Sequence, residues 1–233
     1  MPALNEAKTI SAVVEGSKRF GRVIVIDDGS TDDTYVVASV SGAKVISHKR
    51  RMGYGAALDT GFKHMVADIF VTIDADLQQD PSEIGALLEP ILRDDADFVI
   101  GSKFLGNLRY RPAIINYLVE VVCHSLLNVL YGVQITNVFS GFRAFRAEIV
   151  KRKVVGSEGM VFTLKLVLRA IDRGDKIVEV PRTALPRSHQ RSRVGFRDGL
   201  EILYSLFTFI LTHRPKRYRT VTGQRKELKG GYH

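Results

Sequence analysis

The sequence predicts an α/β protein whose mostly parallel sheet is flanked by helices on both faces. Short apolar runs that are typical of buried strands alternate with segments of helical spacing along the first half of the chain. Two acidic clusters, at residues 27–28 and 74–76, directly follow two of these apolar runs. Because ligands of such sheets bind beyond the carboxyl ends of the strands, we interpret both clusters as functional.

The first half of the chain supplies most of the predicted sheet. A β-branched run closed by an Asp-Asp-Gly-Ser turn predicts the first strand, and Ser30 or Thr31 is expected to cap the helix after it. Pro81 suits the first turn of a further helix. The predicted strands are residues 23–26, 43–47, 69–73 and 97–100, and the predicted helices are residues 31–40, 53–66 and 83–93.

The second half is more apolar and more helical. Residues 114–131 predict a helix with apolar residues on most sides, and residues 174–181 contain a short strand. Residues 199–212 predict a second helix with little polar face. This helix is expected either to pack against the first one or to lie in a membrane interface.

Composition excludes several classes of protein. With 233 residues, 45% of them hydrophobic and 25% charged, the chain is typical of a folded globular protein rather than a disordered one. Cys123 is the only cysteine, which excludes a disulfide scaffold and suits a reducing cytoplasm. We interpret it as a small buried apolar residue. We expect no secretory signal and no membrane span, because neither an apolar leader nor an apolar run of about 18 residues is found.

Positive charge gathers at the end of the chain. The net charge is +9, and residues 187–233 hold eleven Lys or Arg against three Asp or Glu. Such a segment suits an anionic partner such as lipid headgroups, a phosphate substrate or nucleic acid, or it is simply solvated. Nucleic acid is the least favoured, because neither an RNA-recognition motif nor zinc-ligand spacing is found, and the six histidines are scattered.

The sharpest chemical feature is the pair Asp74 and Asp76 after an apolar strand. Two carboxylates at this spacing can share Mg²⁺ or Mn²⁺, which prefer oxygen ligands and leave room for substrate phosphates. Such a cation would neutralise the charge that develops on a departing diphosphate. The alternative is a pair of helix-capping residues before Pro81.

Two further motifs are weaker when taken singly. Asp28 lies at a strand end, where a carboxylate can accept hydrogen bonds from a nucleobase or a ribose, and Gly29 lets the chain turn sharply. The alternative is an acidic turn that caps the next helix. The small residues at 53–57 allow close approach of a ligand or of a neighbouring strand.

In their order along the chain, the motifs resemble the family 2 glycosyltransferases. Within that family they are most similar to the dolichol-phosphate mannose and glucose synthases and the polyprenyl-phosphate glycosyltransferases. The resemblance covers about residues 1–212. The motifs that carry it are residues 2–6, Asp27-Asp28-Gly29-Ser30-Thr31-Asp32, Gly53-Tyr54-Gly55-Ala56-Ala57, Asp74-Ala75-Asp76-Leu77-Gln78 with Pro81, Ile100-Gly101-Ser102 and Ser140-Gly141-Phe142-Arg143-Ala144.

The resemblance implies a GT-A fold, with a nucleotide-sugar half at about residues 1–104 and an acceptor half at about 105–212. It implies C-terminal apolar helices and, beyond them, a basic tail at residues 213–233. The implied activity is metal-dependent, inverting transfer of a sugar from a UDP- or GDP-linked donor to a polyprenyl or dolichyl phosphate. The protein would then be peripheral on the cytoplasmic face of a membrane, with Mg²⁺ or Mn²⁺ as its cofactor.

The resemblance also implies roles for individual residues. Asp74, Asp76 and Gln78 would bind the metal, and Lys103 and Arg193 would face the phosphates as catalytic cations together with Asp76 and Arg143. The residues that would bind the nucleotide sugar are Pro2, Leu4, Glu6, Asp28, Asp74, Ala75, Asp76, Lys103 and Arg193, and those that would bind the acceptor phosphate are Arg143, Arg187 and Arg191.

The chain departs from the family pattern at several positions. Lys103 replaces the usual Arg, Asn137 replaces a frequent Asp, residues 160–165 lack a frequent acidic residue, and the family's strand before Pro2 is shortened. Two alternatives therefore remain. One is a family 2 enzyme with a soluble acceptor, and the other is a non-catalytic paralogue that binds a nucleotide sugar or a membrane.

Overall fold

The structure is a computed structural model of the chain. It describes residues 1–107, 109, 114–151, 161–186 and 196–212. The predicted basic tail at residues 213–233 lies outside the described residues.

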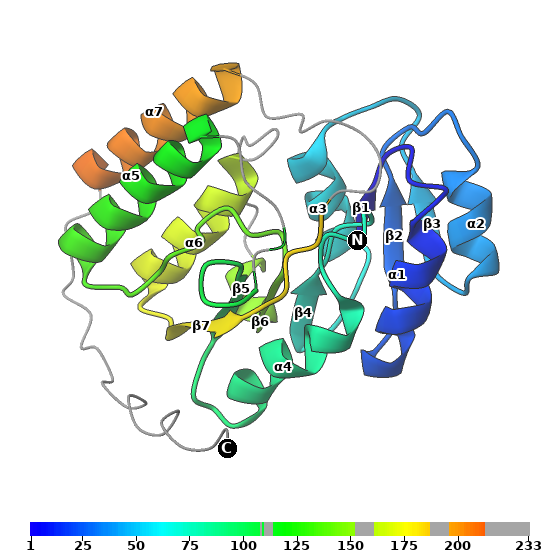
Figure 1. The fold of residues 1–233 in the computed structure, drawn as a ribbon, viewed down its shortest axis with the longest axis horizontal. Helices are drawn as coiled ribbons and strands as arrows, with labels where there is room; N and C mark the ends of the chain where they lie inside the picture. The colour runs from blue at the N-terminus through cyan, green and yellow to red at the C-terminus, as the bar shows by residue number, and fades with distance from the viewer. Residues whose placement is uncertain (108, 110–113, 152–160, 187–195, 213–233) are drawn as a thin grey trace.

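Three parallel strands form the first sheet, in the order β1-β2-β3. Residues 24–27 of β2 are all buried, as the β-branched run predicts. Figure 1 shows this sheet with α1 and α2 at one end of the molecule. The elements are β1 (Pro2–Ala3), β2 (Ile24–Asp27), β3 (Lys44–Ser47), α1 (Ile10–Ser17), the short helix η1 (Lys18–Phe20), α2 (Thr34–Val40) and α3 (Tyr54–Lys63).

Four strands form the second sheet, in the order β4-β6-β5-β7. β5 and β7 are parallel, whereas β6 runs antiparallel to both β4 and β5. The prediction of a mostly parallel sheet therefore holds with one exception, β6, which the sequence analysis did not predict as a strand. The elements are β4 (Ile69–Thr72), β5 (Phe98–Ser102), β6 (Arg143–Arg146) and β7 (Ile177–Pro181).

Helices cover both faces of this second sheet. Helix α4 (Ile84–Leu92), preceded by the short helix η2 (Pro81–Glu83), packs on one face. The opposite face carries α6 and α7, and α5 packs beside α7 (Figure 1). The bounds are α5 (Ile114–Tyr131), η3 (Ala147–Ile149), α6 (Val161–Arg173) and α7 (Phe196–Thr212).

Successive side chains of a strand point to opposite faces of the sheet, so the second sheet separates two apolar cores. Phe98 and Phe145 belong to the core under α5, α6 and α7, whereas Val99 and Ala144 belong to the core under α4. The Phe145 ring stacks on Phe98 with centroids 5.4 Å apart and meets Phe62 edge-on at 5.6 Å. This aromatic cluster joins the second sheet to α3.

The predicted helix at 199–212 packs against the helix at 114–131, which was one of its two expected arrangements, and a place in a membrane interface stays a prediction. Ile202 and Leu206 are buried in the core, and Phe209 packs on the ring of Tyr131 from α5. On the same helix Leu203 and Phe207 are exposed. Helix α7 is therefore anchored in the fold and still presents apolar side chains to the outside.

Element ends and two helices differ from the sequence-based predictions. The helix predicted at 31–40 begins at Thr34 after Asp33, so the predicted caps at Ser30 and Thr31 are wrong. Both residues instead bond to Asn5, Ser30 through its hydroxyl and Thr31 through its main-chain N–H. The helix predicted at 53–66 ends at Lys63, and α1 and α6 were not predicted.

Two leucines on α7 test how firmly this helix belongs to the fold. Leu206 is 2% exposed and Leu203 is 43% exposed. We expect Leu206→Ala to lower the free energy of unfolding by about 2–5 kcal/mol, because it leaves a cavity. We expect the matched Leu203→Ala to cost about 0.5 kcal/mol or less. Urea unfolding measures both, and equal effects would contradict the packing of α7.

Candidate functional site

The loop after β4 carries the two carboxylates that the sequence singled out, Asp74 and Asp76. Asp74 accepts a hydrogen bond from the Tyr54 hydroxyl at 2.9 Å on one oxygen and from Gln79 Nε2 at 2.6 Å on the other. Asp76 is buried and accepts from the main-chain N–H of Gln78 at 3.0 Å. Hydrogen bonds therefore fix the orientation of both carboxylates, and the helix-capping alternative is wrong, because Asp80 caps η2.

The loop itself is tightly wound. Leu77 has a φ of 59°, a left-handed conformation that a leucine rarely adopts. The main-chain N–H of Asp74 donates to Gln79 Oε1 at 2.9 Å and closes the loop on itself. A strained residue held by its surroundings is typical of functional loops.

The electrostatics of this loop favour a bound cation. Burial raises the pKa of Asp74, and the nearby charge of Asp76 raises it further, against hydrogen bonds from Tyr54 and Gln79 and the charge of Arg182. Burial and Asp74 also raise the pKa of Tyr54 well above its usual value. A divalent cation would stabilise two neighbouring carboxylates that have too little positive charge around them.

The side chains present fit Mg²⁺ or Mn²⁺ held together with a diphosphate. Among the described residues, no group of three or more His, Cys, Asp or Glu side chains could hold a metal. Mg²⁺ is commonly held by one or two carboxylates together with substrate phosphates and water. Asp74 and Asp76 would supply the carboxylates. Gln78, the predicted further ligand, donates from its side-chain amide to the Leu185 carbonyl at 3.3 Å.

Gly141 lies directly against the side chains of Asp74 and Tyr54. A Cβ atom at this position would lie 2.5 Å from Asp74 Oδ2 and 2.8 Å from the Tyr54 hydroxyl. The Gly141 carbonyl accepts from the Thr72 hydroxyl at 2.7 Å, which ties it to the end of β4. Only glycine fits here without displacing the carboxylate, which gives a physical reason for the glycine of the Ser-Gly-Phe-Arg motif.

Arg182, which the sequence analysis missed, joins the carboxylate loop to β5. Its Nε donates to the Gly101 carbonyl at 3.2 Å, and its Nη1 donates to the Gln78 carbonyl at 3.3 Å. It is a buried cation that lowers the pKa of Asp74. Its place directly after β7, at the carboxyl end of a strand, is the signal that could have identified it.

Lys103, predicted to face phosphate, directly follows β5. Burial lowers the pKa of Lys103, the carboxylate of Glu120 opposes this shift, and Arg182 adds to it. Its Nζ lies 5.0 Å from the centre of the Phe104 ring, within cation–π range. Its main-chain N–H donates to Asn137 Oδ1 at 3.3 Å.

The predicted nucleoside-binding residues at 2–6 lie beside β2 and the loop that follows it. Pro2 pairs with β2, and the main-chain N–H of Glu6 donates to Thr34 Oγ1 at 2.8 Å. Leu4 and Glu6 are half-buried, and Ala75 is buried in the core shared with β2 and α1. The fold thus brings residues 2–6 beside the loop after β2, as a shared pocket requires.

Asp28 is buried and already bonded within the protein. Its carboxylate accepts from Met52 N and Gly53 N and bonds His48 Nδ1, each at 2.8 Å. His48 Nε2 bonds in turn to Thr60 Oγ1 at 2.9 Å. In this conformation Asp28 braces the loop before α3, and its contact with a base or ribose stays a prediction.

Arg143 lies inside the protein, with 1% of its surface exposed. Its Nη1 donates to the Thr163 carbonyl at 2.7 Å, its Nη2 donates to the Val138 carbonyl, and its buried Nε has no partner among the described residues. Burial lowers the pKa of Arg143 to about 10. The observed bonds tie β6 to α6, and its predicted contact with the acceptor phosphate stays a prediction. Arg187, Arg191 and Arg193 lie outside the described residues.

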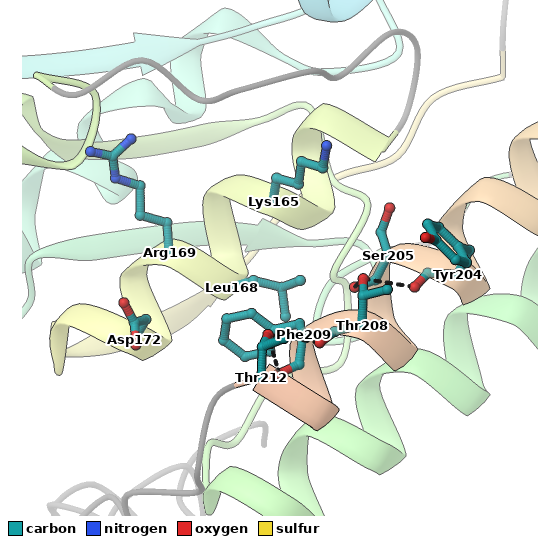
Figure 2. A pocket seen from close by; sticks show the side chains of 9 residues that line it. All are labelled: Lys165, Leu168, Arg169, Asp172, Tyr204, Ser205, Thr208, Phe209 and Thr212. Atoms are coloured by element: carbon teal, nitrogen blue, oxygen red, sulfur yellow. Dashed lines mark hydrogen bonds between the residues drawn. The ribbon is translucent and has the colours of Figure 1, made fainter.

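An open groove of about 390 Å³ runs between α6 and α7. Figure 2 shows Leu168 and Phe209 between the two helices, with Lys165 and Arg169 along α6. Hydroxyl groups of α7 line the other side. None of the predicted site residues that the structure describes lines this groove, and the carboxylates of Asp74 and Asp76 are not part of it.

Comparisons with known proteins agree with this geometry. Residues 1–153 match the model of the family described as Glycosyl transferase family 2. The UDP-N-acetylglucosamine–dolichyl-phosphate N-acetylglucosaminyltransferase of Methanococcus voltae is 31% identical over 88% of this chain and 92% of its own length. The polyprenol monophosphomannose synthase of Mycolicibacterium smegmatis is 28% identical over 95% of this chain and 89% of its own length.

Solved structures with the same fold include glucosyl-3-phosphoglycerate synthase from Mycobacterium tuberculosis. Its complex with Mn²⁺, UDP and phosphoglyceric acid has a TM-score of 0.71 and 26% identity, over 89% of this chain and 76% of that one. Its complex with Mg²⁺ and UDP has a TM-score of 0.72 and 25% identity, over 92% and 78%. The match confirms the predicted GT-A fold.

The raised pKa of Asp74 predicts how stability depends on pH. In the folded protein the pKa of the Asp74 carboxyl lies above its ordinary value of 3.8, so folding favours the protonated carboxyl. The contribution of Asp74 to stability therefore falls as the pH rises above 3.8. Asp74→Asn removes this titration. We therefore expect its free energy of unfolding, relative to the unsubstituted protein, to rise between pH 4 and pH 7. Urea unfolding with EDTA measures the difference, and a constant value would contradict the raised pKa.

The close approach of Gly141 gives a second prediction. Gly141→Ala should displace Asp74 or Tyr54 and weaken binding of Mn²⁺ with UDP by roughly tenfold or more, comparable to the loss of a residue that orients a metal ligand. Gly21→Ala is the matched control, because a Cβ at Gly21 would meet nothing within 4 Å. Isothermal titration calorimetry measures binding, and circular dichroism checks the fold. Equal binding by both variants would refute the role of Gly141.

Proposed function

Because the chain belongs to glycosyl transferase family 2, we propose that it transfers a sugar from a UDP- or GDP-linked donor to a polyprenyl phosphate at the cytoplasmic face of a membrane. The observation that carries the proposal is the pair Asp74 and Asp76 at the end of β4, with the pKa of Asp74 raised by burial and by its neighbour. This arrangement suits a metal–diphosphate complex.

In this mechanism Asp74 and Asp76 would hold a divalent cation, which would neutralise charge on the leaving diphosphate. Tyr54 and Gln79 keep the Asp74 carboxylate in place by their hydrogen bonds. The donor phosphates would lie within reach of Lys103, and Arg193, outside the described residues, is proposed as a second cation. Support comes from structural relatives that bind Mn²⁺ or Mg²⁺ together with UDP.

The acceptor needs little chemical activation. A phosphate monoester has its second pKa near 6, so at neutral pH it is mostly a dianion and already a competent nucleophile. A strong general base is therefore not required, in contrast to transfer to a sugar hydroxyl. Catalysis then consists of positioning and charge stabilisation, and in-line attack inverts the anomeric centre. Arg143, Arg187 and Arg191 are the proposed contacts of the acceptor phosphate.

Exposed apolar residues favour an acceptor that stays in lipid. Helices α5 and α7 lie side by side (Figure 1). Both expose several large apolar side chains, and exposed apolar residues in number are typical of protein or membrane contact surfaces. Of the two relatives reported above, one is named as a dolichyl-phosphate N-acetylglucosaminyltransferase and the other as a polyprenol monophosphomannose synthase. The exposed residues are Ile114, Tyr117, Leu118, Val122, Leu126 and Val129 on α5, and Leu203, Tyr204, Phe207 and Leu211 on α7.

No helix within the described part of the chain is long and apolar enough to cross a bilayer. We propose that α5 and α7 contact the membrane surface, and that the basic residues after α7 add attraction of about 1 kcal/mol each near anionic lipid.

A soluble acceptor is the second candidate. It is favoured by the glucosyl-3-phosphoglycerate synthase structures, one of which holds phosphoglyceric acid together with UDP. This candidate predicts transfer without lipid.

A panel of UDP- and GDP-sugars with Mn²⁺ or Mg²⁺ tests the proposal, with a short polyprenyl phosphate and phosphoglyceric acid as acceptors. We expect lipid-linked sugar as the product. Asp76→Asn should lower kcat/KM roughly 100-fold or more, the kinetic equivalent of losing metal stabilisation. Asp80→Asn is the matched control, because Asp80 only accepts a capping hydrogen bond from Ser82.

Transfer only to phosphoglyceric acid would favour the second candidate. Donor binding without transfer to either acceptor would identify a non-catalytic paralogue. Near-normal transfer by Asp76→Asn would remove the metal role.

A further inference from the structure

Two glutamates from different elements, one buried and one half-buried, hold the segment that leads from α5 into β6. Glu120 lies on α5 and Glu179 lies on β7. Both accept hydrogen bonds from residues 136–139, a segment without regular secondary structure. Neither glutamate belongs to a motif that the sequence analysis identified.

Glu120 is 4% exposed, and both of its carboxylate oxygens are occupied. Oε2 accepts from the side-chain amide of Asn137 at 3.1 Å, and Oε1 accepts from the main-chain N–H of Phe139 at 3.1 Å. The first bond fixes which way the Asn137 amide points, because its nitrogen must face Glu120. Its oxygen is then free to accept from the main-chain N–H of Lys103.

Glu179 holds the same segment from the other side. It accepts from the N–H and the hydroxyl of Thr136 at 2.9 and 2.6 Å and from the N–H of Asn137 at 2.8 Å. The Thr136 hydroxyl also bonds the Ser102 hydroxyl at 2.7 Å. Glu179 therefore fixes the backbone, and Glu120 fixes the side chain of Asn137.

The stretch from residue 136 to Gly141, between α5 and β6, contacts two residues of the proposed diphosphate site. Asn137 reaches the main chain of Lys103, and Gly141 lies against Asp74. Between them the Ser140 hydroxyl donates to the Gly101 carbonyl at 2.7 Å. The position of Lys103 relative to Asp74 thus depends on this segment.

The charges around Lys103 come from several elements. The charge of Glu120 on α5 raises the pKa of Lys103, and the charge of Arg182 after β7 lowers it. Arg143 on β6 also acts on Glu120, and burial raises the pKa of Glu120. The ring of Tyr117 on α5 meets the Phe104 ring edge-on at 5.9 Å. Within this set Glu120 is the group whose charge counters the burial of Lys103.

We propose that Glu120 is a positioning residue for sugar transfer, which acts through Asn137 to fix the backbone of Lys103 and supplies the negative charge that balances its ammonium group. The proposal deepens the proposed function and rests on it for the role of Lys103 toward phosphate. It also explains why Asn stands at position 137, since a second carboxylate there would face Glu120.

A purely structural role would not need a charge at this position. Burying a carboxylate costs free energy, and a glutamine can also accept the N–H of Phe139. A carboxylate is more favourable than an amide where cations are nearby, and the cations that act on Glu120 are Lys103 and, with a smaller effect, Arg143.

The experiment compares three variants of the full chain: Glu120→Gln, the swap Glu120→Gln with Asn137→Asp, and Glu120→Gln in a Lys103→Arg background. The swap keeps one carboxylate and one amide in contact but exchanges their places, so the negative charge beside Lys103 returns. The arginine stays protonated at every working pH, so it removes the titration at position 103. Circular dichroism and thermal unfolding check that each variant folds.

Two readouts decide the proposal. The first is the pH titration of Lys103 by NMR with ¹³C-labelled lysine, in which Lys103→Arg identifies the signal. The second is the pH profile of kcat/KM for transfer. For Glu120→Gln we expect the Lys103 titration to move to lower pH and the loss of kcat/KM to be roughly threefold larger at pH 9 than at pH 7.

The swap should restore both readouts, and in the arginine background Glu120→Gln should leave the shape of the profile unchanged. An unmoved Lys103 titration in Glu120→Gln, or a swap that folds without restoring it, would overturn the proposal. If the unsubstituted protein transfers no sugar to either acceptor, the proposed function fails, and the NMR titration still decides whether Glu120 balances Lys103.

Discussion

The burial of the Asp74 carboxylate beside the charge of Asp76 is the constraint on which the rest of the site depends. Two carboxylates close together and out of water are unfavourable unless charge or hydrogen bonds compensate them. Tyr54 and Gln79 supply hydrogen bonds, Arg182 supplies charge, and together they leave the pKa of Asp74 still raised. The divalent cation of a metal–diphosphate complex would compensate the negative charge that remains. The site is therefore suited to a ligand that is itself highly charged.

The elements that hold this pair come from distant parts of the chain. Tyr54 lies in the first turn of α3, Gly141 lies just before the antiparallel strand β6, and Arg182 follows β7. They meet because β4, β5 and β7 end at the same edge of one sheet, while β6 begins there. A similar convergence joins Lys103, Asn137 and Glu120, so one edge of the sheet carries both the anionic and the cationic half of the site.

Helices α5 and α7 connect this site to the outside of the molecule. Their inner faces complete the core that covers the second sheet, and their outer faces expose leucine, valine and aromatic side chains. Glu120 on the inner face of α5 reaches the segment before β6, so the helix proposed to contact lipid also helps to position Lys103. In the proposed function, acceptor delivery and donor binding therefore share one structural element.

Strands β2, β3, β4, β5 and β7, the placement of both acidic clusters at strand ends, and the family could all be predicted from the sequence alone. These features depend on local apolar patterns and on motifs whose order along the chain is visible. The antiparallel strand β6, the buried state of Arg143 and the roles of Tyr54, Gly141, Arg182 and Glu120 were decided only by the tertiary structure. Each depends on contacts between residues far apart in the chain, such as Glu120 with Asn137 or Gly141 with Asp74. Local sequence patterns cannot predict these contacts, because the distances between such residues depend on how the sheet and the helices pack together.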